Sequence, residues 1–231
     1  MENTICKDRA ESSPRAISIQ TFPRKTVAVD EAAPMKPARY LLKRSIKNLV
    51  LLIMLPAFVL YWILSGGGKS DSVFQSFSQF LSLLPGKAGV YLRAAFYRLA
   101  CPDTSDEISI GFLTILSHRN TTIHKGVYIG PQCNIGMCTI GKDTLIGSGV
   151  HLLSGNEQHR FSDPETPIQE QGGSFKRIVV GTDCWIGNSC VVLSNISDHC
   201  IAAAAAVVVN EFEEGSILAG LPAKKISSRS S

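Results

Sequence analysis

Hydrophobic residues recur with two different periods along this chain of 231 residues, and the period changes near residue 108. Before that point, an uncharged apolar run covers residues 49–64, and apolar residues return at helical spacing over 73–84. A third apolar stretch, residues 90–100, carries Arg93 and Arg98. After residue 108 the helical spacing ends and glycine becomes frequent. The pattern predicts a short helical region followed by a mainly β domain.

The β region repeats a unit of six residues that begins with a large aliphatic residue. Glycine follows that residue in seven units, which start at Ile110, Ile129, Ile135, Ile140, Ile146, Val180 and Ile186. Four more residues fit the same slot without the glycine: Ile123, Leu152, Ile196 and Ile201. The fifth slot is always small, namely Thr114, Val127, Cys133, Thr139, Thr144, Val150, Cys184, Cys190, Cys200 and Ala205. Because one large side chain in six must share a common interior, the repeat predicts a parallel β-helix.

Four segments follow from these patterns. Residues 1–45 form a basic, disordered tail, which is either solvated or attracted to an anionic membrane. Residues 46–100 form a helical, membrane-associated hairpin, and an ordinary buried helical subdomain is the alternative. Residues 101–226 form the β-helix, and residues 227–231 form a short tail.

The hairpin is preferred to a simple membrane span because the apolar run is short. Sixteen residues at about 1.5 Å each cover about 24 Å, which is less than the roughly 30 Å of a bilayer core. Pro56 is expected to kink the helix, and Gly66-Gly67-Gly68 permits the chain to reverse. The apolar residues that follow, Phe74, Phe77, Phe80, Leu81 and Leu84, then return beside the first helix or lie in the interface. The β-helix is therefore expected at the cytoplasmic face of a membrane.

Composition narrows the function classes. Hydrophobic residues make up 45% of the chain, which excludes wholesale disorder. A net charge of +4 is too small to indicate a nucleic-acid protein. The seven cysteines include no CxxC pair, which argues against a zinc ribbon and against a disulfide framework. Four of them occupy the small slot of the repeat, so they are expected to be buried core residues in a reducing compartment.

The repeat resembles that of the hexapeptide-repeat acyltransferases, whose coils form a left-handed parallel β-helix. The stretch Val180-Gly-Thr-Asp-Cys-Trp-Ile-Gly-Asn-Ser-Cys-Val-Val192 is typical of the branch that contains maltose, galactoside and polysaccharide O-acetyltransferases. So is the ending Gly215-Ser-Ile-Leu-Ala-Gly-Leu-Pro-Ala-Lys-Lys-Ile226. The resemblance implies transfer of acetyl from acetyl-CoA, without a metal, in a homotrimer with active sites between subunits.

Residues 154–178 interrupt the repeat and contain one histidine, His159. In the similar acetyltransferases a histidine in this loop is the catalytic base, and His159 is the match. A neutral imidazole suits removal of a proton from an acceptor hydroxyl. Glu157, Asp163 or a backbone carbonyl are candidate orienting groups, and His151 is the second candidate base because it precedes the loop.

The same resemblance implies a coenzyme A groove built from an aromatic wall, small residues and cations. The matching positions are Trp185, Ala204, Ala205, Pro222, Lys224 and Lys225. The run Ile201-Ala-Ala-Ala-Ala-Ala206 replaces the Ile-Gly-Ala-Gly-Ala that is usual in the family, which adds methyl groups near this groove.

The expected acceptor is a sugar hydroxyl of a surface polysaccharide or of its lipid-linked precursor. N-acetylation of an amino sugar, acylation of a drug, and a non-catalytic β-helix scaffold at a membrane are the alternatives. The fold also occurs in zinc-dependent carbonic anhydrases, where two histidines lie five residues apart. His151 would need a partner at position 156, which is Asn156, so zinc hydration is not favoured.

Overall fold

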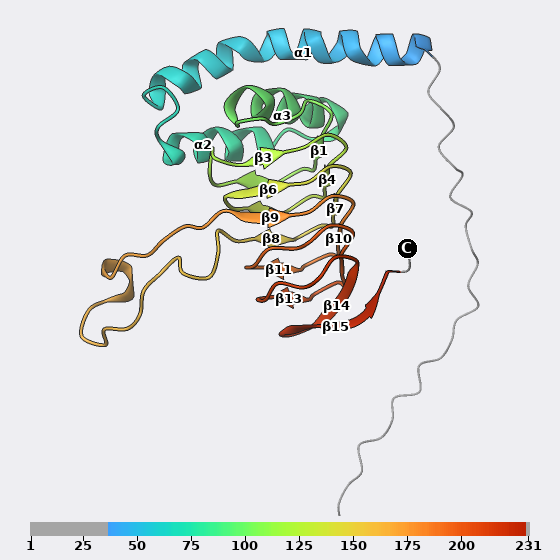
Figure 1. Ribbon diagram of the computed structural model, residues 1–231. Helices are drawn as coiled ribbons and strands as arrows, with labels where there is room; N and C mark the ends of the chain where they lie inside the picture. The colour runs from blue at the N-terminus through green and yellow to red at the C-terminus, as the bar shows by residue number, and fades with distance from the viewer. Residues whose placement is uncertain (1–36, 230–231) are drawn as a thin grey trace, which may run out of the picture. The chain divides into compact units, whose positions relative to one another are not determined.

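The computed structural model describes residues 37–229, which form three helices and a stack of short strands (Figure 1). The helices are α1 (Pro37–Leu64), α2 (Asp71–Ser82) and α3 (Gly86–Ala100). The first eight strands are β1 (Ser109–Ile110), β2 (Ile115–Leu116), β3 (Thr122–Ile123), β4 (Tyr128–Ile129), β5 (Asn134–Ile135), β6 (Cys138–Ile140), β7 (Leu145–Ile146) and β8 (His151–Leu152). A 3₁₀ turn, η1 (Ile168–Glu170), precedes β9 (Ile178–Val180), β10 (Trp185–Ile186), β11 (Val191–Val192), β12 (Ile201–Ala202), β13 (Val207–Val208), β14 (Ser216–Gly220) and β15 (Ala223–Ser228).

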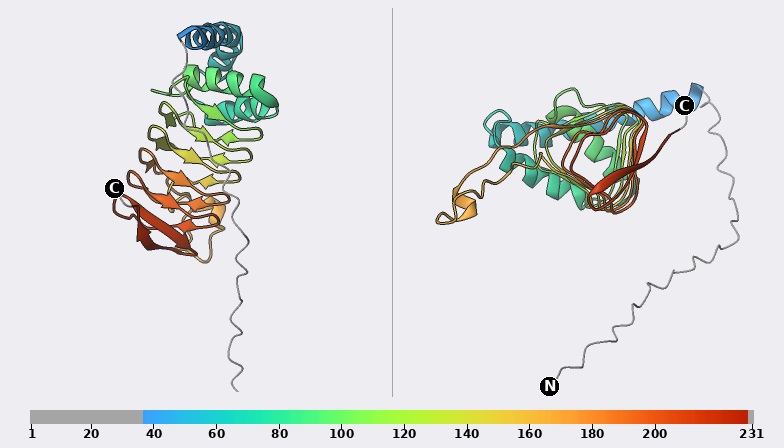
Figure 2. Two further views of the ribbon diagram at one scale, coloured as in Figure 1. Left: turned by 90° about the vertical axis from the view of Figure 1, so that its right-hand side faces the viewer. Right: turned by 60° about the horizontal axis from the view of Figure 1, so that its bottom comes forward.

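The strands form three sheets, which are the three faces of a parallel β-helix (Figure 2). The first face has the order β1-β4-β7-β10-β12-β14-β15, the second β13-β11-β8-β5-β2, and the third β3-β6-β9. All pairs are parallel except β14 and β15, which form an antiparallel closing pair. The mainly β architecture and the parallel β-helix predicted from the six-residue repeat are therefore confirmed.

The interior of the β-helix is the column of aliphatic residues that the repeat predicts. The seven residues that start an aliphatic–glycine unit are completely buried, as are Ile123 and Leu152. One assignment was wrong by a single residue: Ile201 pairs with Trp185 and is only partly buried, whereas Ala202 pairs with Ile186 and is buried. Strand register decides this, because a shift of one residue moves a side chain to the other face. The small slot of this coil is consequently the buried Ala206.

The cysteines that the repeat places in the small slot lie in the core. Cys133, Cys184, Cys190 and Cys200, which were predicted to fill the small slot, are all buried and not in disulfides. Loss of hydration disfavours a thiolate, so burial raises the pKa of each of these thiols, and that of Cys184 to about 11. These side chains are core residues rather than nucleophiles.

Helices α2 and α3 cover the end of the stack at the first coil (Figure 1). Phe74 of α2 and Phe96 and Tyr97 of α3 are completely buried, and Tyr61 of α1 reaches the same aromatic cluster. Hydrogen bonds also join this cap to the first coil, since Leu116 N donates to Ser78 Oγ at 2.8 Å. The cap thus shields the interior of the first coil from water.

Helix α2 returns beside α1, which is one of the two arrangements predicted for the helical segment. Phe74 and Leu81 of α2 face the cap interior, while Phe80 is exposed, so this helix packs on α1 as part of a folded cap. Helices α2 and α3 cover the β-helix, whereas the membrane association of this segment stays a prediction. Their apolar residues are needed over the open end of the β-helix, where they exclude water from the first coil.

The structure changes two of the predicted segment boundaries. Residues 37–45, assigned to the tail, belong to α1, because Pro37 can occupy the first turn and the following residues are mostly good helix formers. The helix curves but continues through Pro56 (Figure 1). At the other end, residues 227–228 lie in β15 rather than in a tail, because they pair with residues 216–217 of β14. The rest of the predicted basic tail, residues 1–36, lies outside the described residues.

Candidate functional site

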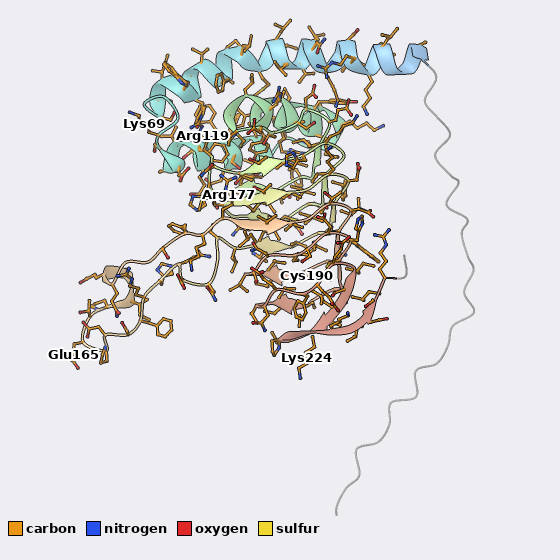
Figure 3. All side chains as sticks on the ribbon, in the orientation of Figure 1. Lys69, Arg119, Glu165, Arg177, Cys190 and Lys224 are labelled. Atoms are coloured by element: carbon orange, nitrogen blue, oxygen red, sulfur yellow. The ribbon has the colours of Figure 1, made fainter. Side chains whose placement is uncertain are left out.

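The insert that interrupts the repeat leaves the stack between β8 and β9 and projects away from it (Figures 1 and 2). Its two arms are joined by backbone hydrogen bonds, from Ser174 N to Glu157 O at 2.8 Å and from Arg160 N to Gly172 O at 2.9 Å. Figure 3 places Glu165 at its far end. The insert therefore has a narrow stem and a wider tip.

His159 lies in the first arm of this stem and is exposed. Its two candidate orienting carboxylates are engaged elsewhere. Glu157 accepts a bond from Lys176 Nζ at 2.8 Å, and this bond lowers the pKa of the Glu157 carboxyl. Asp163 accepts from the Thr166 hydroxyl at 2.7 Å, and this bond lowers its carboxyl pKa. Among residues 37–229, neither carboxylate is hydrogen-bonded to His159. Both carboxylates instead stabilise the fold of the insert through their bonds to Lys176 and Thr166.

His151, the second candidate base, is on β8, and it is exposed on the outer side of the second face. Its neighbours across the ladder are Asn134 of β5 and Val191 of β11. The side chain therefore lies on the face from which the insert departs rather than in the insert itself.

The residues that match the coenzyme A groove lie on or next to the first face. Trp185 is on β10, is 55% exposed, and stands between Leu145 and Ile201. Ala204 and Ala205 are exposed at the corner between β12 and β13.

The remaining three groove residues lie at the closing pair of strands. Pro222 is in the turn between β14 and β15 and follows a cis peptide bond. Lys224 and Lys225 are exposed on β15, and Figure 3 labels Lys224 at the last coil. Lys225 is paired with Glu213, so Lys224 is the more available cation.

One chain does not bring His159 and Trp185 together. The insert departs from the corner between the second and third faces, because β8 belongs to one and β9 to the other. Trp185 stands on the first face, which is opposite that corner in a three-sided stack (Figure 2). A site that uses both residues consequently requires two chains.

A cavity of about 410 Å³ opens at the base of the insert. Its walls come from the start of α2, from three successive coils and from both arms of the insert. Hydroxyl, amide, imidazole and carboxylate groups line it together with one aromatic ring, and the lining includes Asp71, His118, Asn134, Ser154, Gln158 and Phe175. A polar cavity with an aromatic wall is suited to a small hydroxyl-rich molecule.

A histidine–carboxylate pair forms part of this cavity. His118 Nδ1 lies 2.9 Å from Asp71 Oδ2, and the imidazole lies against the Phe175 ring, with centroids 4.9 Å apart. Asp71 Oδ1 also accepts from Arg119 N at 3.0 Å, which fixes the carboxylate. The pair orients the His118 ring and leaves Nε2 without a protein partner among residues 37–229.

The sequence analysis did not select His118, Asp71 or Phe175. His118 lies 47 residues after Asp71 and 57 residues before Phe175, and only the packing of α2 and the insert around the first coil brings the three together. No local motif marks such a set. The sequence feature that comes nearest to marking this cavity is the loop that contains Gln158 and His159, because a loop that interrupts a regular solenoid is a frequent place for binding residues.

Comparison with known proteins identifies several acetyltransferases. Over 118 residues, the chain is 30% identical to a chloramphenicol acetyltransferase of Agrobacterium fabrum, a match that covers 44% of this chain and 56% of the relative. Over 114 residues, it is 31% identical to the putative lipopolysaccharide biosynthesis O-acetyl transferase WbbJ of Escherichia coli, covering 46% and 57%. The chain therefore spans a little over half the length of these relatives. No family model matches it.

Solved structures share the fold. A hexapeptide-repeat-containing acetyltransferase of Vibrio cholerae, in complex with acetyl coenzyme A, superposes with a TM-score of 0.58 and 19% identity. The alignment covers 69% of this chain and 89% of that one. The repeat, the β-helix and these likenesses support the hexapeptide-repeat acyltransferase family that the sequence resembles, and the solved structures share its fold.

Proposed function

We propose that the protein transfers acetyl from acetyl-CoA to a hydroxyl of a sugar or glycan. The observation that carries the proposal is the cavity of about 410 Å³ at the base of the insert, one residue from His159 along the chain. Its amide, hydroxyl and carboxylate groups offer the hydrogen-bonding partners that a sugar requires, and Phe175 offers an apolar surface for a sugar ring. The curated relatives support the reaction class, because both are named acetyltransferases.

His159 is the proposed base. The acceptor oxygen attacks the thioester carbonyl carbon while its proton passes to the imidazole. The C–S bond then breaks, and the thiolate of coenzyme A takes a proton as it leaves. No protein nucleophile is needed for this direct transfer, in agreement with the buried cysteines and their raised thiol pKa values.

Acetyl-CoA is proposed to bind along the first face, against Trp185 and near Lys224. The exposed indole provides an apolar wall, and the Lys224 ammonium, which forms no ion pair among residues 37–229, provides a cation for phosphate. Since the insert departs from the opposite corner of the same chain, the His159 that acts beside this coenzyme would come from a neighbouring chain. Exposed apolar side chains on the insert support such a neighbour, because Phe161 is 77% exposed. A homotrimer closes this arrangement with three equivalent sites.

Mixed oligomers test both parts of the proposal. The variants His159→Ala and Trp185→Ala are purified separately and then co-expressed with different tags. Each homogeneous variant should lose at least about a hundredfold in acetyl transfer. In the mixed oligomer about a quarter of the wild-type rate should return, since each site draws its two residues at random from the two chain types.

The acceptor class is tested with the wild-type protein. Acetyl-CoA turnover is compared across free sugars, lipid-linked glycans, amino sugars and chloramphenicol. A sugar hydroxyl that reacts fastest supports the proposal, and exclusive reaction at an amine contradicts it. Normal turnover in the His159→Ala homogeneous protein would remove that residue from the mechanism. No turnover with any acceptor, together with no binding of coenzyme A, would favour a scaffold.

A further inference from the structure

Helix α1 carries large hydrophobic residues on two opposite sides. Its inner side is a stripe at seven-residue spacing, formed by the apolar Met54 and Tyr61 and by Lys47, and this stripe is buried against α3 and the cap. Its outer side consists of exposed large hydrophobic residues, namely Leu41, Leu42, Ile46, Leu49, Leu52, Ile53, Leu55, Val59, Leu60, Trp62, Ile63 and Leu64. No charged residue follows Lys47 in the helix. A helix with this composition is stable only where an apolar phase also covers its outer side.

Charge is divided sharply along the described chain. Residues 37–100 contain eight Lys and Arg and a single acidic residue, Asp71. Residues 101–231 contain nine basic and thirteen acidic residues. The helical end is therefore strongly positive, whereas the β-helix is slightly negative. Figure 3 shows Lys69 at the turn where α1 ends, and Lys43 is exposed near its start.

We propose that α1 lies flat in the interface of an anionic lipid membrane. Its outer side would enter the acyl region, and its flanking cations would meet the phosphates. Figures 1 and 2 show α1 as the outermost layer, running across the end of the stack. The β-helix then projects from the lipid surface with the insert directed sideways. This inference does not depend on the chemistry proposed above.

Length alone does not exclude a membrane span. The candidate span Leu41–Leu64 has 24 residues, or about 36 Å of helix, although its first part contains Lys43, Arg44 and Lys47 and only the sixteen residues 49–64 form the uncharged apolar run. The contacts between the inner side of α1 and the cap favour a helix that lies flat in the membrane interface. Tyr61 contacts Phe58, Phe74, Phe77 and Phe96, with ring centroids 5.5–6.1 Å apart. A span that left the cap would open this aromatic cluster to water.

Polar contacts hold the other end of α1 on the β-helix. Arg44 Nη1 lies 2.7 Å from Asp106 Oδ2, and Lys47 Nζ donates to Asp106 O at 2.6 Å. Lipid is favoured over a second copy as the occupant of the outer side. Two such helices face to face would bring two sets of cations together, with no acidic residue between 37 and 70 to neutralise them.

Vesicle flotation tests the proposal with the full-length protein. Ile63→Glu and Leu52→Glu place a carboxylate on the outer side, and Ile226→Glu is the matched control, because Ile63 and Ile226 are 63% and 64% exposed. Wild type and Ile226→Glu should float with phosphatidylglycerol–phosphatidylcholine vesicles. Binding of Ile63→Glu and Leu52→Glu should fall at least tenfold, with unchanged melting temperatures. Equal binding by all four proteins would overturn the proposal.

Impermeant maleimide labelling distinguishes the flat helix from a span. Ser45→Cys and Ser228→Cys are each made in a Cys6→Ser chain and studied in sealed membrane vesicles of known orientation. Labelling of both from one side supports the flat position, and labelling from opposite sides overturns it. A second copy as the occupant would appear as lipid-free association that Ile63→Glu abolishes without any vesicle binding by wild type, and this outcome also overturns the proposal.

Discussion

Arg93 joins the helical cap to the β-helix, and its replacement should separate the two. The side chain is completely buried on α3 and has no carboxylate partner in the described residues. Its Nε donates to Ile110 O at 2.9 Å, and its Nη1 donates to Leu81 O at 3.0 Å and to Leu84 O at 2.7 Å. One guanidinium therefore satisfies the end of α2 and the first strand together. Burial lowers the pKa of this guanidinium, because loss of hydration disfavours its charged form.

The magnitude follows from these three bonds. Arg93→Met keeps most of the aliphatic volume but removes the donor of the buried Ile110 O and of the half-buried Leu84 O, at about 1–3 kcal/mol each, while Leu81 O keeps its bond from Leu84 N at 3.3 Å. Removal of a buried charge recovers part of this loss, so we expect a net destabilisation of about 2–4 kcal/mol. For a domain of this size, about 2–4 °C is lost per kcal/mol, which corresponds to roughly 4–16 °C in melting temperature.

Arg98→Met is the matched control on the same helix. Arg98 is exposed and makes one bond, from Nη1 to Thr104 O at 2.9 Å, so its loss should cost about 0.5–1.5 kcal/mol. Thermal unfolding followed by circular dichroism measures both variants, and limited proteolysis tests whether α2 is released first. Melting of Arg93→Met within about 3 °C of wild type would refute the reasoning, because the carbonyls of Ile110 and Leu84 would then have lost their donor at no cost.

Three further predictions concern the β-helix. In a Cys6→Ser chain, the six described cysteines should resist maleimide at pH 8 and all react after unfolding, since burial raises the pKa of Cys184 to about 11; rapid labelling of the native protein would contradict this. Ala205→Gly should raise the melting temperature by a few degrees, because Ala205 has φ 60°, whereas Ala204→Gly should lower it. Gly187→Ala should destabilise by more than about 2 kcal/mol, because its methyl group would lie 2.5 Å from Ala204 N; an unchanged midpoint in urea would count against that contact.

The β-helix was predictable because its determinants are local and repeated. One aliphatic residue in six with a small residue four positions later is enough to define the interior, and the burial of Ile129, Ile146 and Ile186 follows that pattern. The register near Ile201 was not predictable, because five alanines in succession give no contrast between inner and outer positions. Pairing of Ala202 with Ile186 decided it.

The candidate site was predictable only where its residues lie in one loop. His159 is marked by the interruption of the repeat, but the pairing of His118 with Asp71 depends on how α2 rests on the first coil. The choice between a membrane hairpin and a buried helical subdomain was left open for a similar reason. A hydropathy pattern shows that the face of α2 is apolar, but it does not distinguish lipid from a β-helix end that needs cover.

The cap connects the two proposals geometrically. If α1 lies in the membrane interface, the cavity lies near the lipid surface, because Asp71 and Gln75 in its wall follow Leu64, the end of α1, by only seven and eleven residues. Arg44 and Lys47 of α1 also contact Asp106, just before the first strand of the stack. Coils follow at about 4.8 Å intervals, and the cavity uses residues of the first three coils, Ser117, Asn134 and Leu152, so it extends only about 10 Å along the stack. The arrangement therefore favours an acceptor whose reacting sugar stays close to the headgroups, such as a lipid-linked glycan, over a free sugar in solution.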